Sequence, residues 1–297
     1  MRATAAAVSG ALALTAFAVP TALAATAGTS DAAAAVRAGH DAALSKAASA
    51  QRAAAPFGLR AGTDDGSGDT QISDVVVNGG KDVVLGTTNA KTVTVTFTVT
   101  DDSGAAWADA ILWHGPTFDE LDAGVLANED EADCTATSDT TANCKQTFTI
   151  DPQVDLTNAV AGGWKVEAIA QGNDTDWVQQ DSVKSFAMKR YSKLTVNASP
   201  EPVKKGRTLT ITGSLTRANW DTSKYGGYTK QTVALQSRPA SGGSYTTSKT
   251  YTSGSGSSAG VVKTTRTAGK DTCWRYSFAG TSTTPSVTST GDCVDVR

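Results

Sequence analysis

The sequence predicts an all-β fold, with two β-sandwich domains of immunoglobulin-like type in tandem. Three observations support this prediction. Short segments alternate apolar and polar residues with a period of two, dense Gly, Asp, Asn and Ser turns separate them, and 297 residues are enough for two ordinary domains. The clearest segment is TVTVTFTV at 92–99, which places Val93, Val95, Phe97 and Val99 on one face and threonines on the other.

Residues 1–24 predict a signal peptide for export. Arg2 gives the positive start, an apolar run continues to Val19, and Ala22-Leu23-Ala24 supplies the small residues of a cleavage site. A membrane anchor is the alternative, but Pro20 interrupts the run, which is short. No later stretch is apolar enough to span a bilayer. We therefore expect a secreted monomer without membrane contact after cleavage, free outside the cell or held non-covalently to the wall.

Residues 25–69 predict a tether rather than a packed domain. This segment is rich in alanine, the best helix former, but has few large apolar residues to bury. A marginal helix without a partner face frays in water. The sequence AGTDDGSGD at 61–69 is typical of a flexible linker.

Residues 70–190 form the first predicted sandwich. Besides TVTVTFTV, the segments QTFTID at 146–151 and GWKVEAIA at 163–170 alternate in the same way. VVVNGGKDVVL at 75–85 contains an Asn-Gly turn signal between two valine-rich runs.

Residues 191–297 form the second predicted sandwich. About seven short strands in roughly a hundred residues are typical of the immunoglobulin-like fold. Trp274, Tyr276 and Phe278 share one strand face, and we interpret them as core residues.

Four cysteines fall into two close pairs, Cys134 with Cys144 and Cys273 with Cys293. Export favours disulfides, and the local pairing is the simplest of the three possible connectivities. Zinc is the alternative, but neither pair has the spacing of a zinc knuckle and histidine is scarce.

Several segments resemble secreted actinomycete proteins of Streptomyces type. In the first domain they are ISDVVVNGGKDVVLGTT, LWHGP, LANEDEADCTATS and VDLTNAVAGGWKV, and in the second they are SKLTVNASPEPVKKGRTLTITGSLTRANWDTSKYGGYTKQTVALQ, WRYSFAGTSTTPSV and GDCVDVR. In that family a domain of unknown function precedes an immunoglobulin-like C-terminal module. The resemblance covers roughly residues 72–297. Such proteins often carry the label "calcium-binding protein", and the resemblance supplies no catalytic residues.

Charge is divided unequally between the domains. Residues 70–190 hold 19 Asp and Glu against 7 Lys and Arg, whereas residues 191–297 hold 5 against 14. The net charge of −3 therefore conceals an acidic and a basic half. The basic half predicts contact with an anionic wall polymer, and scattered solubilising charge is the alternative. Nucleic acid is a poor partner for an exported protein with an acidic domain.

The sequence does not predict an enzyme. Only His40, in the tether, and His114, before a Gly-Pro turn, could serve as a catalytic base. GSSAG at 256–260 has the letters of a nucleophile motif, but it lies in a low-complexity turn without the strand-to-helix context. No pair of carboxylates is singled out for glycoside hydrolysis, so a hydrolase is a distant alternative.

An acidic segment, FDELDAGVLANEDEADC at 118–134, is the best candidate for a metal site. Calcium takes six to eight oxygen ligands, and an EF-hand pattern is not matched because Ala132 stands at the third ligand position and no glycine follows. The alternatives are a weak calcium site and a solvated loop. The predicted ligands are Asp119, Asp122, Asn128, Asp130 and Asp133. The GNDTDW turn at 172–177 could contribute if the two loops meet.

The loop NWDTSKYGGY at 219–228 is the candidate carbohydrate site, since Trp220 and Tyr225 could stack on sugar faces. Core packing is the alternative interpretation of both rings. Taken together, the sequence predicts a secreted, non-enzymatic binding or wall-associated protein with calcium as the one candidate ion. A carbohydrate-binding protein is the alternative function.

Overall fold

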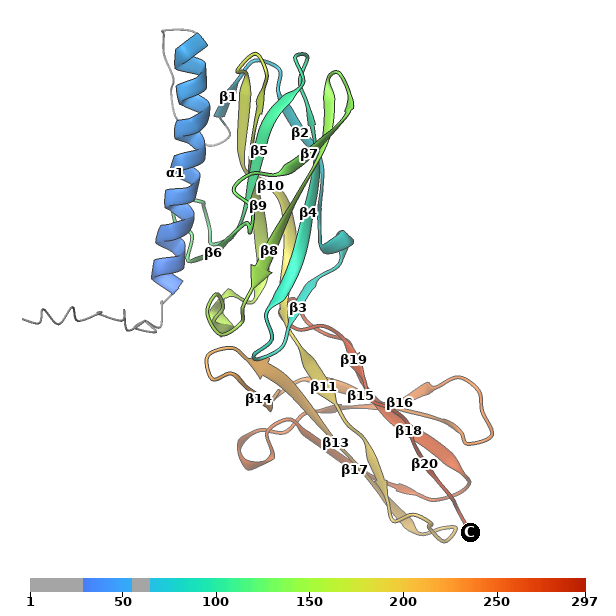
Figure 1. The fold of residues 1–297 in the computed structure, drawn as a ribbon. Coiled ribbons are helices and arrows are strands. Elements are labelled where there is room, and N and C mark those ends of the chain that lie inside the picture. The colour runs from blue at the N-terminus through green and yellow to red at the C-terminus, as the bar shows by residue number, and fades with distance from the viewer. Residues whose placement is uncertain (1–28, 55–64) are drawn as a thin grey trace, which may run out of the picture.

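The computed structural model describes residues 29–54 and 65–297, so the predicted signal peptide lies outside the described residues. Two β-sandwiches follow each other along the long axis of the molecule, and a helix runs beside the first (Figure 1). The all-β, sandwich-type fold class is therefore confirmed. Within the described residues, no helix is both long enough and apolar enough to cross a membrane.

The first sandwich has a six-stranded and a four-stranded sheet. The larger has the order β1-β10-β9-β5-β6, with β3 also paired to β10, and the smaller has the order β2-β4-β8-β7. The strands are β1 Asp65–Ser67, β2 Gln71–Val77, β3 Val83–Leu85, β4 Lys91–Thr100, β5 Ala105–His114, β6 Ala123–Leu126, β7 Asp133–Ser138, β8 Thr141–Ile150, β9 Gly162–Gly172 and β10 Trp177–Arg190.

The alternating pattern of β4 places its apolar face in the core between these sheets. Val93, Val95, Phe97 and Val99 are each at most 2% exposed. β4 pairs with β8 over its whole length in antiparallel register. The period of two thus positions this strand as the sequence predicts.

The Asn-Gly turn between the two valine-rich runs is present, but the runs do not form a hairpin. Asn78–Gly80 is a single 3-10 turn, η1, with φ of 51°, 62° and 78° in order. β2 enters the four-stranded sheet and β3 the six-stranded sheet, where β3 is parallel to β10. The turn therefore carries the chain from one sheet to the other, a step that the local signal does not distinguish from a hairpin.

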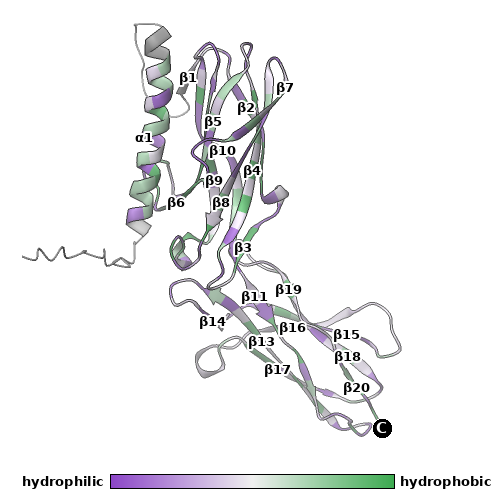
Figure 2. Ribbon diagram, in the orientation of Figure 1, coloured by the Kyte–Doolittle hydropathy of each residue, from purple (hydrophilic) through white to green (hydrophobic). Residues whose placement is uncertain are grey.

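Helix α1, Thr29–Ala54, lies along the outer face of the six-stranded sheet, which differs from the expected free tether. The sheet supplies the large side chains that the helix lacks. Two apolar clusters form between them, made by Ala33, Val36, Ile111, Trp113, Phe118 and Leu121 and by Ala47, Trp107, Ile169 and Trp177. Figure 2 shows the helix mainly in green, as its alanine content implies.

Two glycines allow the helix to approach the sheet edge closely. A Cβ on Gly124 of β6 would stand 2.6 Å from Val36, and a Cβ on Gly39 of the helix would stand 2.9 Å from Leu126. Each glycine thus accepts a branched side chain from the opposite element. This fit fixes the position of α1 along β6.

The second sandwich also has two sheets. One has the order β11-β13-β12 with β14 and β17 paired to β13, and the other has the order β16-β15-β18-β19 with β20 paired to β18. The strands are β11 Ser192–Leu194, β12 Asn197–Ser199, β13 Thr208–Asn219, β14 Lys224–Gly227, β15 Thr232–Pro239, β16 Thr246–Thr252, β17 Val261–Thr267, β18 Thr272–Phe278, β19 Val287–Thr288 and β20 Asp292–Val294.

Aromatic residues of β18 face the core of this sandwich, as predicted for two of the three. Tyr276 and Phe278 are 0% and 3% exposed, and the Tyr276 hydroxyl donates a hydrogen bond to the Ile211 carbonyl at 3.1 Å. Trp274 is half-buried and packs against the edge of the same cluster.

Both predicted disulfides are present. Cys134–Cys144 joins directly opposed residues of β7 and β8, and Cys273–Cys293 joins opposed residues of β18 and β20. Each bridge therefore clips a strand at the edge of its sheet, rather than linking the two sheets of one sandwich.

Candidate functional site

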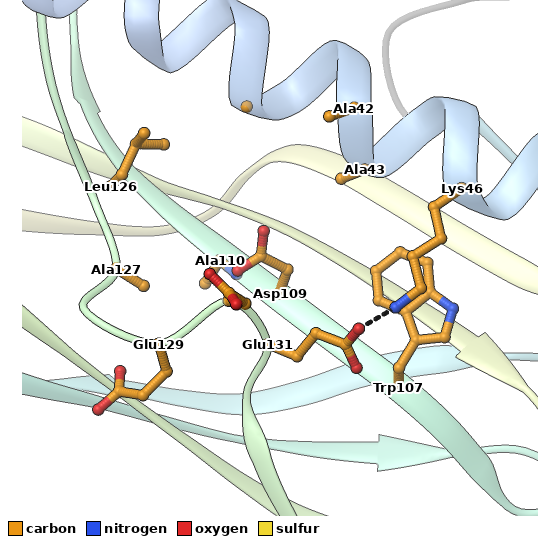
Figure 3. Close-up of a pocket in the computed structure, with 12 residues that line it drawn as sticks. Ala42, Ala43, Lys46, Trp107, Asp109, Ala110, Leu126, Ala127, Glu129 and Glu131 are labelled. Atoms are coloured by element: carbon orange, nitrogen blue, oxygen red, sulfur yellow. Dashed lines mark hydrogen bonds and ion pairs between the residues drawn. The ribbon is translucent and has the colours of Figure 1, made fainter.

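A cleft of about 310 Å³ lies between α1, β5 and the acidic loop at 127–132 that joins β6 to β7 (Figure 3). We call it the α1 cleft. Its lining residues are Gly39, Ala42, Ala43 and Lys46 of α1, Trp107, Asp109 and Ala110 of β5, and Leu126, Ala127, Glu129, Asp130 and Glu131 from the end of β6 and the loop.

Backbone hydrogen bonds hold the acidic loop across the edge of the sandwich. The Asn128 amide donates to the Thr147 carbonyl of β8, and the Ala132 amide donates to the Ala108 carbonyl of β5, both at 2.8 Å. The loop thus bridges the two sheets. The position of the loop therefore depends on two strands, β5 and β8, whose residues are distant from it in the sequence.

Glu129 is turned toward β8. Its carboxylate accepts hydrogen bonds from the Thr147 hydroxyl at 2.6 Å and the Thr147 amide at 2.8 Å. These hydrogen bonds lower the pKa of Glu129, because they favour the charged form. Figure 3 shows this carboxylate pointing away from Asp109.

Asp109 is the half-buried carboxyl of the cleft. Its Oδ1 accepts hydrogen bonds from Gln146 Nε2 at 2.6 Å and from the Ala110 amide at 2.9 Å. Burial nevertheless raises the pKa of Asp109 to about 6, and the charges of Glu167 and Glu131 act in the same direction. Among the ion pairs of the described residues, none involves Asp109.

Lys46 is the one basic residue in the lining of the cleft, and its ammonium group already has partners. It forms an ion pair with Glu131 and lies 4.1 Å from the centroid of the Trp107 ring. The ammonium group of Lys46 is therefore already occupied by Glu131 and Trp107 (Figure 3).

Of the two predicted metal ligands at the start of the acidic segment, Asp122 has another partner for its carboxylate, and Asp119 is contacted through its backbone carbonyl. Asp122 Oδ1 lies 2.6 Å from His114 Nδ1. The Asp119 carbonyl accepts a hydrogen bond from Arg37 of α1 at 3.1 Å. Both aspartates lie in the connection between β5 and β6, beside the N-terminal half of the helix.

The later predicted ligands are dispersed. Asn128 donates from Nδ2 to the Thr147 hydroxyl at 2.8 Å, Asp130 lines the α1 cleft, and Asp133 starts β7 at 4.0 Å from Lys145 Nζ. In this geometry the five predicted ligands do not converge on one point, because the loop is stretched between two sheets.

One group of three carboxylates elsewhere does converge. Within residues 29–54 and 65–297, it is the one set of three His, Cys, Asp or Glu ligand atoms within 4.8 Å of one another, and it consists of Asp69, Asp101 and Asp102. Asp101 is 1% exposed and accepts hydrogen bonds from Thr70 and Ser103. Repulsion by Asp69 is the largest cause of the raised pKa of Asp102.

The GNDTDW turn meets this acidic group rather than the loop at 127–132. The Asp174 amide donates to Ser103 Oγ at 3.0 Å, and Asn173 Nδ2 donates to the Ser103 carbonyl at 2.8 Å. Acidic groups at an exposed sandwich end commonly occur without an ion, so this cluster alone does not define a metal site.

Sequence reasoning missed a buried pair beneath the helix. His40 Nδ1 of α1 lies 3.3 Å from Glu167 Oε1 of β9, and the Glu167 side chain is 2% exposed. Burial raises the pKa of Glu167. Burial would lower the pKa of His40, but the hydrogen bond and charge of Glu167 outweigh it, so the pKa is raised. The available signal was Glu167 itself, a charge inside the apolar strand GWKVEAIA.

The loop that is the candidate sugar site belongs to the second domain and packs against the first domain at their junction. Trp220 is 2% exposed, and its indole N–H donates to the Gly86 carbonyl of the first domain at 2.9 Å. Tyr225 is half-buried, with Lys193 Nζ 3.8 Å from its ring centroid. The Trp220 ring is therefore not available for stacking on a ligand, because the domain junction covers it.

The fold and the cleft thus define a tandem β-sandwich protein with a helix docked on its first domain. A family model described as a family of unknown function (DUF5707) matches residues 84–170. This range runs from β3 into β9 and includes the acidic loop and the inner strands of the first sandwich. A search of curated proteins found no match.

Solved structures show only distant similarity. Latent PorU from Porphyromonas gingivalis is 15% identical with a TM-score of 0.28, over 76% of this chain and 20% of that one. Red sea bream transglutaminase is 14% identical with a TM-score of 0.27, over 80% and 32%. The amphioxus IgVJ-C2 molecule is 9% identical with a TM-score of 0.25, over 72% and 99%. The chain thus spans about a fifth of PorU and a third of the transglutaminase.

Proposed function

We propose that this chain is an exported, non-enzymatic binding protein, whose basic second domain attaches it to an anionic polymer of the cell wall. The observation that carries the proposal is the charge of that domain, with 14 Lys and Arg against 5 Asp and Glu in residues 191–297. A concentrated positive charge attracts anionic polymers at low salt, and this attraction weakens as salt screens it.

Two arginines of the second domain form a candidate binding surface for an anionic polymer. Arg238 of β15 and Arg275 of β18 lie 5.1 Å and 4.0 Å from the ring centroid of Tyr245. Arg275 alternates with the core residue Tyr276, so its side chain belongs to the outer face of the sheet. Arg275 Nε also donates to Gln236 Oε1 at 2.7 Å. Guanidinium groups held in this way suit phosphate or carboxylate oxygens.

The positions of the two histidines support the non-enzymatic part of the proposal. Both are in the first domain and face a carboxylate, Glu167 for His40 and Asp122 for His114. GSSAG at 256–260 lies in the second domain, where its first residues form the 3-10 turn η3, Gly256–Ser258. The nucleophile-like letters and the candidate bases therefore belong to different domains.

Export and actinomycete origin complete the proposal. Weak calcium binding by the acidic loop stays a prediction, because the converging carboxylates of the described residues are Asp69, Asp101 and Asp102 rather than those of the loop. Two disulfides fit an oxidising compartment. The resemblance to Streptomyces-type secreted proteins supports the proposed origin and is the basis of the calcium prediction. Carbohydrate binding is the less supported alternative, because Trp220 is enclosed at the domain junction.

The test is a pull-down of the full mature chain with isolated cell walls at low and high salt. We expect binding that falls with salt and is lost in Arg238→Gln/Arg275→Gln. The matched control is Lys263→Gln/Lys270→Gln, which removes the same charge elsewhere in the second domain. An equal loss in both double variants would show that net charge, rather than this group, governs attachment. No binding at low salt would contradict the proposal.

A further inference from the structure

We propose that the α1 cleft binds a small organic cation, a primary ammonium group carried on a short apolar chain. This site is independent of wall attachment, because it lies in the first domain between α1, β5 and the acidic loop. Three features of the cleft support this proposal: its excess of carboxylates, the Lys46 ammonium group that it already holds and its apolar walls.

The charge of the cleft is unbalanced. Asp109, Asp130 and Glu131 line it together with a single basic residue, Lys46, which is paired with Glu131. Asp109 is held in place by hydrogen bonds from neutral donors and has no ion pair among the described residues. A half-buried carboxylate without a counter-ion is costly, and a bound cation would reduce that cost.

The chain already places one ammonium group in this cleft. Lys46 Nζ lies between the Glu131 carboxylate and the face of Trp107, 4.1 Å from the ring centroid. A carboxylate beside an aromatic face is an arrangement that recognises alkyl-ammonium groups. Asp109, half-buried, and Asp130, exposed, line the same cleft, and neither forms an ion pair among the described residues.

The carboxylates of the cleft do not suit a metal ion. Calcium requires several oxygens around one point, and the converging carboxylates of the described chain are Asp69, Asp101 and Asp102 at the end of the sandwich, outside the cleft. Carboxylates spread along a lining instead match a ligand that has some length of its own.

The walls supply the apolar part of the recognition. Gly39, Ala42 and Ala43 of the helix line the cleft together with Leu126 and Ala127. Small helix residues leave the space open, whereas longer side chains would fill it. A volume of about 310 Å³ is at the lower end of ligand pockets, which indicates a ligand of a few carbons.

The test uses n-pentylamine as the probe, titrated into the full mature chain at pH 7.5. Isothermal titration calorimetry gives the affinity, and the NMR shift of the Trp107 indole N–H reports the place of binding. We expect a dissociation constant on the order of millimolar, as befits a ligand of six heavy atoms. 1-Pentanol has the same length without the charge, and we expect it to bind at least about tenfold more weakly.

Three variants locate the site. Asp109→Asn and Asp130→Asn should each weaken pentylamine binding by about tenfold or more, which corresponds to one charged hydrogen bond. Asp102→Asn is the matched control, because it removes one carboxylate charge outside the cleft, and it should leave the affinity unchanged. Ala42→Leu fills the cleft without changing its charge and should abolish binding. A thermal melt of each variant verifies folding.

Three outcomes would overturn the proposal. They are the absence of saturable binding by the folded wild type, equal binding of pentylamine and pentanol, and wild-type affinity in Asp109→Asn together with Asp130→Asn. None of them bears on wall attachment, whose variants Arg238→Gln and Arg275→Gln lie in the other domain.

Discussion

The two sandwiches share a fold class but treat their outer sheet faces in opposite ways. In the first domain the outer face of the six-stranded sheet carries Trp107, Ile111, Trp113, Ile169 and Trp177, and α1 covers it. In the second domain the outer face of β16-β15-β18 carries polar side chains such as Gln236, Thr250 and Arg275, and no helix of the described chain covers it.

An apolar outer sheet face thus makes an otherwise weak helix part of the fold. The alanine-rich segment has little to bury by itself, so the tryptophans of the sheet provide most of the apolar area of the contact. The same arrangement creates the α1 cleft, because small helix residues pass over a strand that contains Asp109. The basic domain has no such cover, and its charges remain at the surface for a partner.

The largest expected effect is the removal of a tryptophan under the helix. Trp113 is 2% exposed, and its indole N–H donates to the Asp181 carbonyl at 2.7 Å. Trp113→Ala should destabilise the first domain by about 3–5 kcal/mol, the usual cost of deleting a buried aromatic side chain. Urea denaturation followed by tryptophan fluorescence measures the change. Trp274→Ala, at a half-buried position of the second domain, should cost less, and equal costs would contradict the contrast between the two regions.

A second prediction concerns pH and the docking of the helix. The pKa of His40 is raised in the folded state, so its stabilising contribution is complete below its ordinary pKa of 6.5 and is lost as the pH rises through the raised value. The raised pKa of Glu167 acts in the same direction. The amides of α1 should therefore lose about 1–3 kcal/mol of protection between pH 6 and pH 9, as a buried group loses a charged partner.

Hydrogen exchange of α1, corrected for the intrinsic rates, measures this loss. His40→Gln keeps a neutral hydrogen-bond donor and should remove most of the pH dependence. The amides of β15 in the second domain serve as the internal control. A helix whose protection is equal at both pH values would show that the pair does not control docking.

A further prediction concerns the effect of Asp109 on the stability of the first domain. Its pKa is raised to about 6 in the folded protein, so the wild type loses stability as the pH rises from about 4 to 6. Asp109→Asn has no charge to desolvate and should be about 1–3 kcal/mol more stable than the wild type at pH 7.5. At pH 3 the two proteins should be equally stable. Thermal melts at both pH values test this, and a destabilised variant at pH 7.5 would contradict it.

The smallest expected effect is that of calcium. If the acidic loop binds calcium at millimolar affinity, several millimolar calcium should raise the stability by about 1 kcal/mol or less, through linkage. A melt with calcium, with magnesium and with chelator measures the shift. Asp130→Ala/Asp133→Ala should abolish it, whereas Asp69→Ala/Asp102→Ala should not. The reverse pattern would move the calcium site to the end of the sandwich, and no shift would leave the loop as a solvated one.

Much of the fold could be predicted because its signals are local. Alternation in TVTVTFTV fixes which face of β4 is buried, and Cys134 and Cys144 are close enough along the chain to oppose each other in neighbouring strands. The acidic loop could be recognised as a place of concentrated charge, and Asp130 does line the cleft. The local pattern does not predict which oxygens of the loop lie close enough together to bind one ligand.

Two other features, the buried pair beneath the helix and the domain junction, depend on contacts between residues that are distant in the sequence. His40 and Glu167 are 127 positions apart, and Trp220 and Gly86 are 134 positions apart. No local pattern relates such residues, so the sequence places His40 in a tether and leaves both core packing and sugar binding open for Trp220. Asp109 has an ordinary place in an alternating strand, and only its burial by α1 and the loop makes it unusual.

The all-β class and the unequal charge of the two halves can be deduced from the sequence, because they follow from neighbouring residues and from composition. The sequence favours the local cysteine pairs, and the structure contains both. Only the tertiary structure decided that the alanine-rich segment is a docked helix, that a cleft opens beneath it and that Trp220 closes the domain junction. The physical reason is that burial is a collective property. A helix or a ring becomes buried when a distant strand supplies the opposite surface. The free energy of that contact depends on both segments, so neither segment alone predicts it.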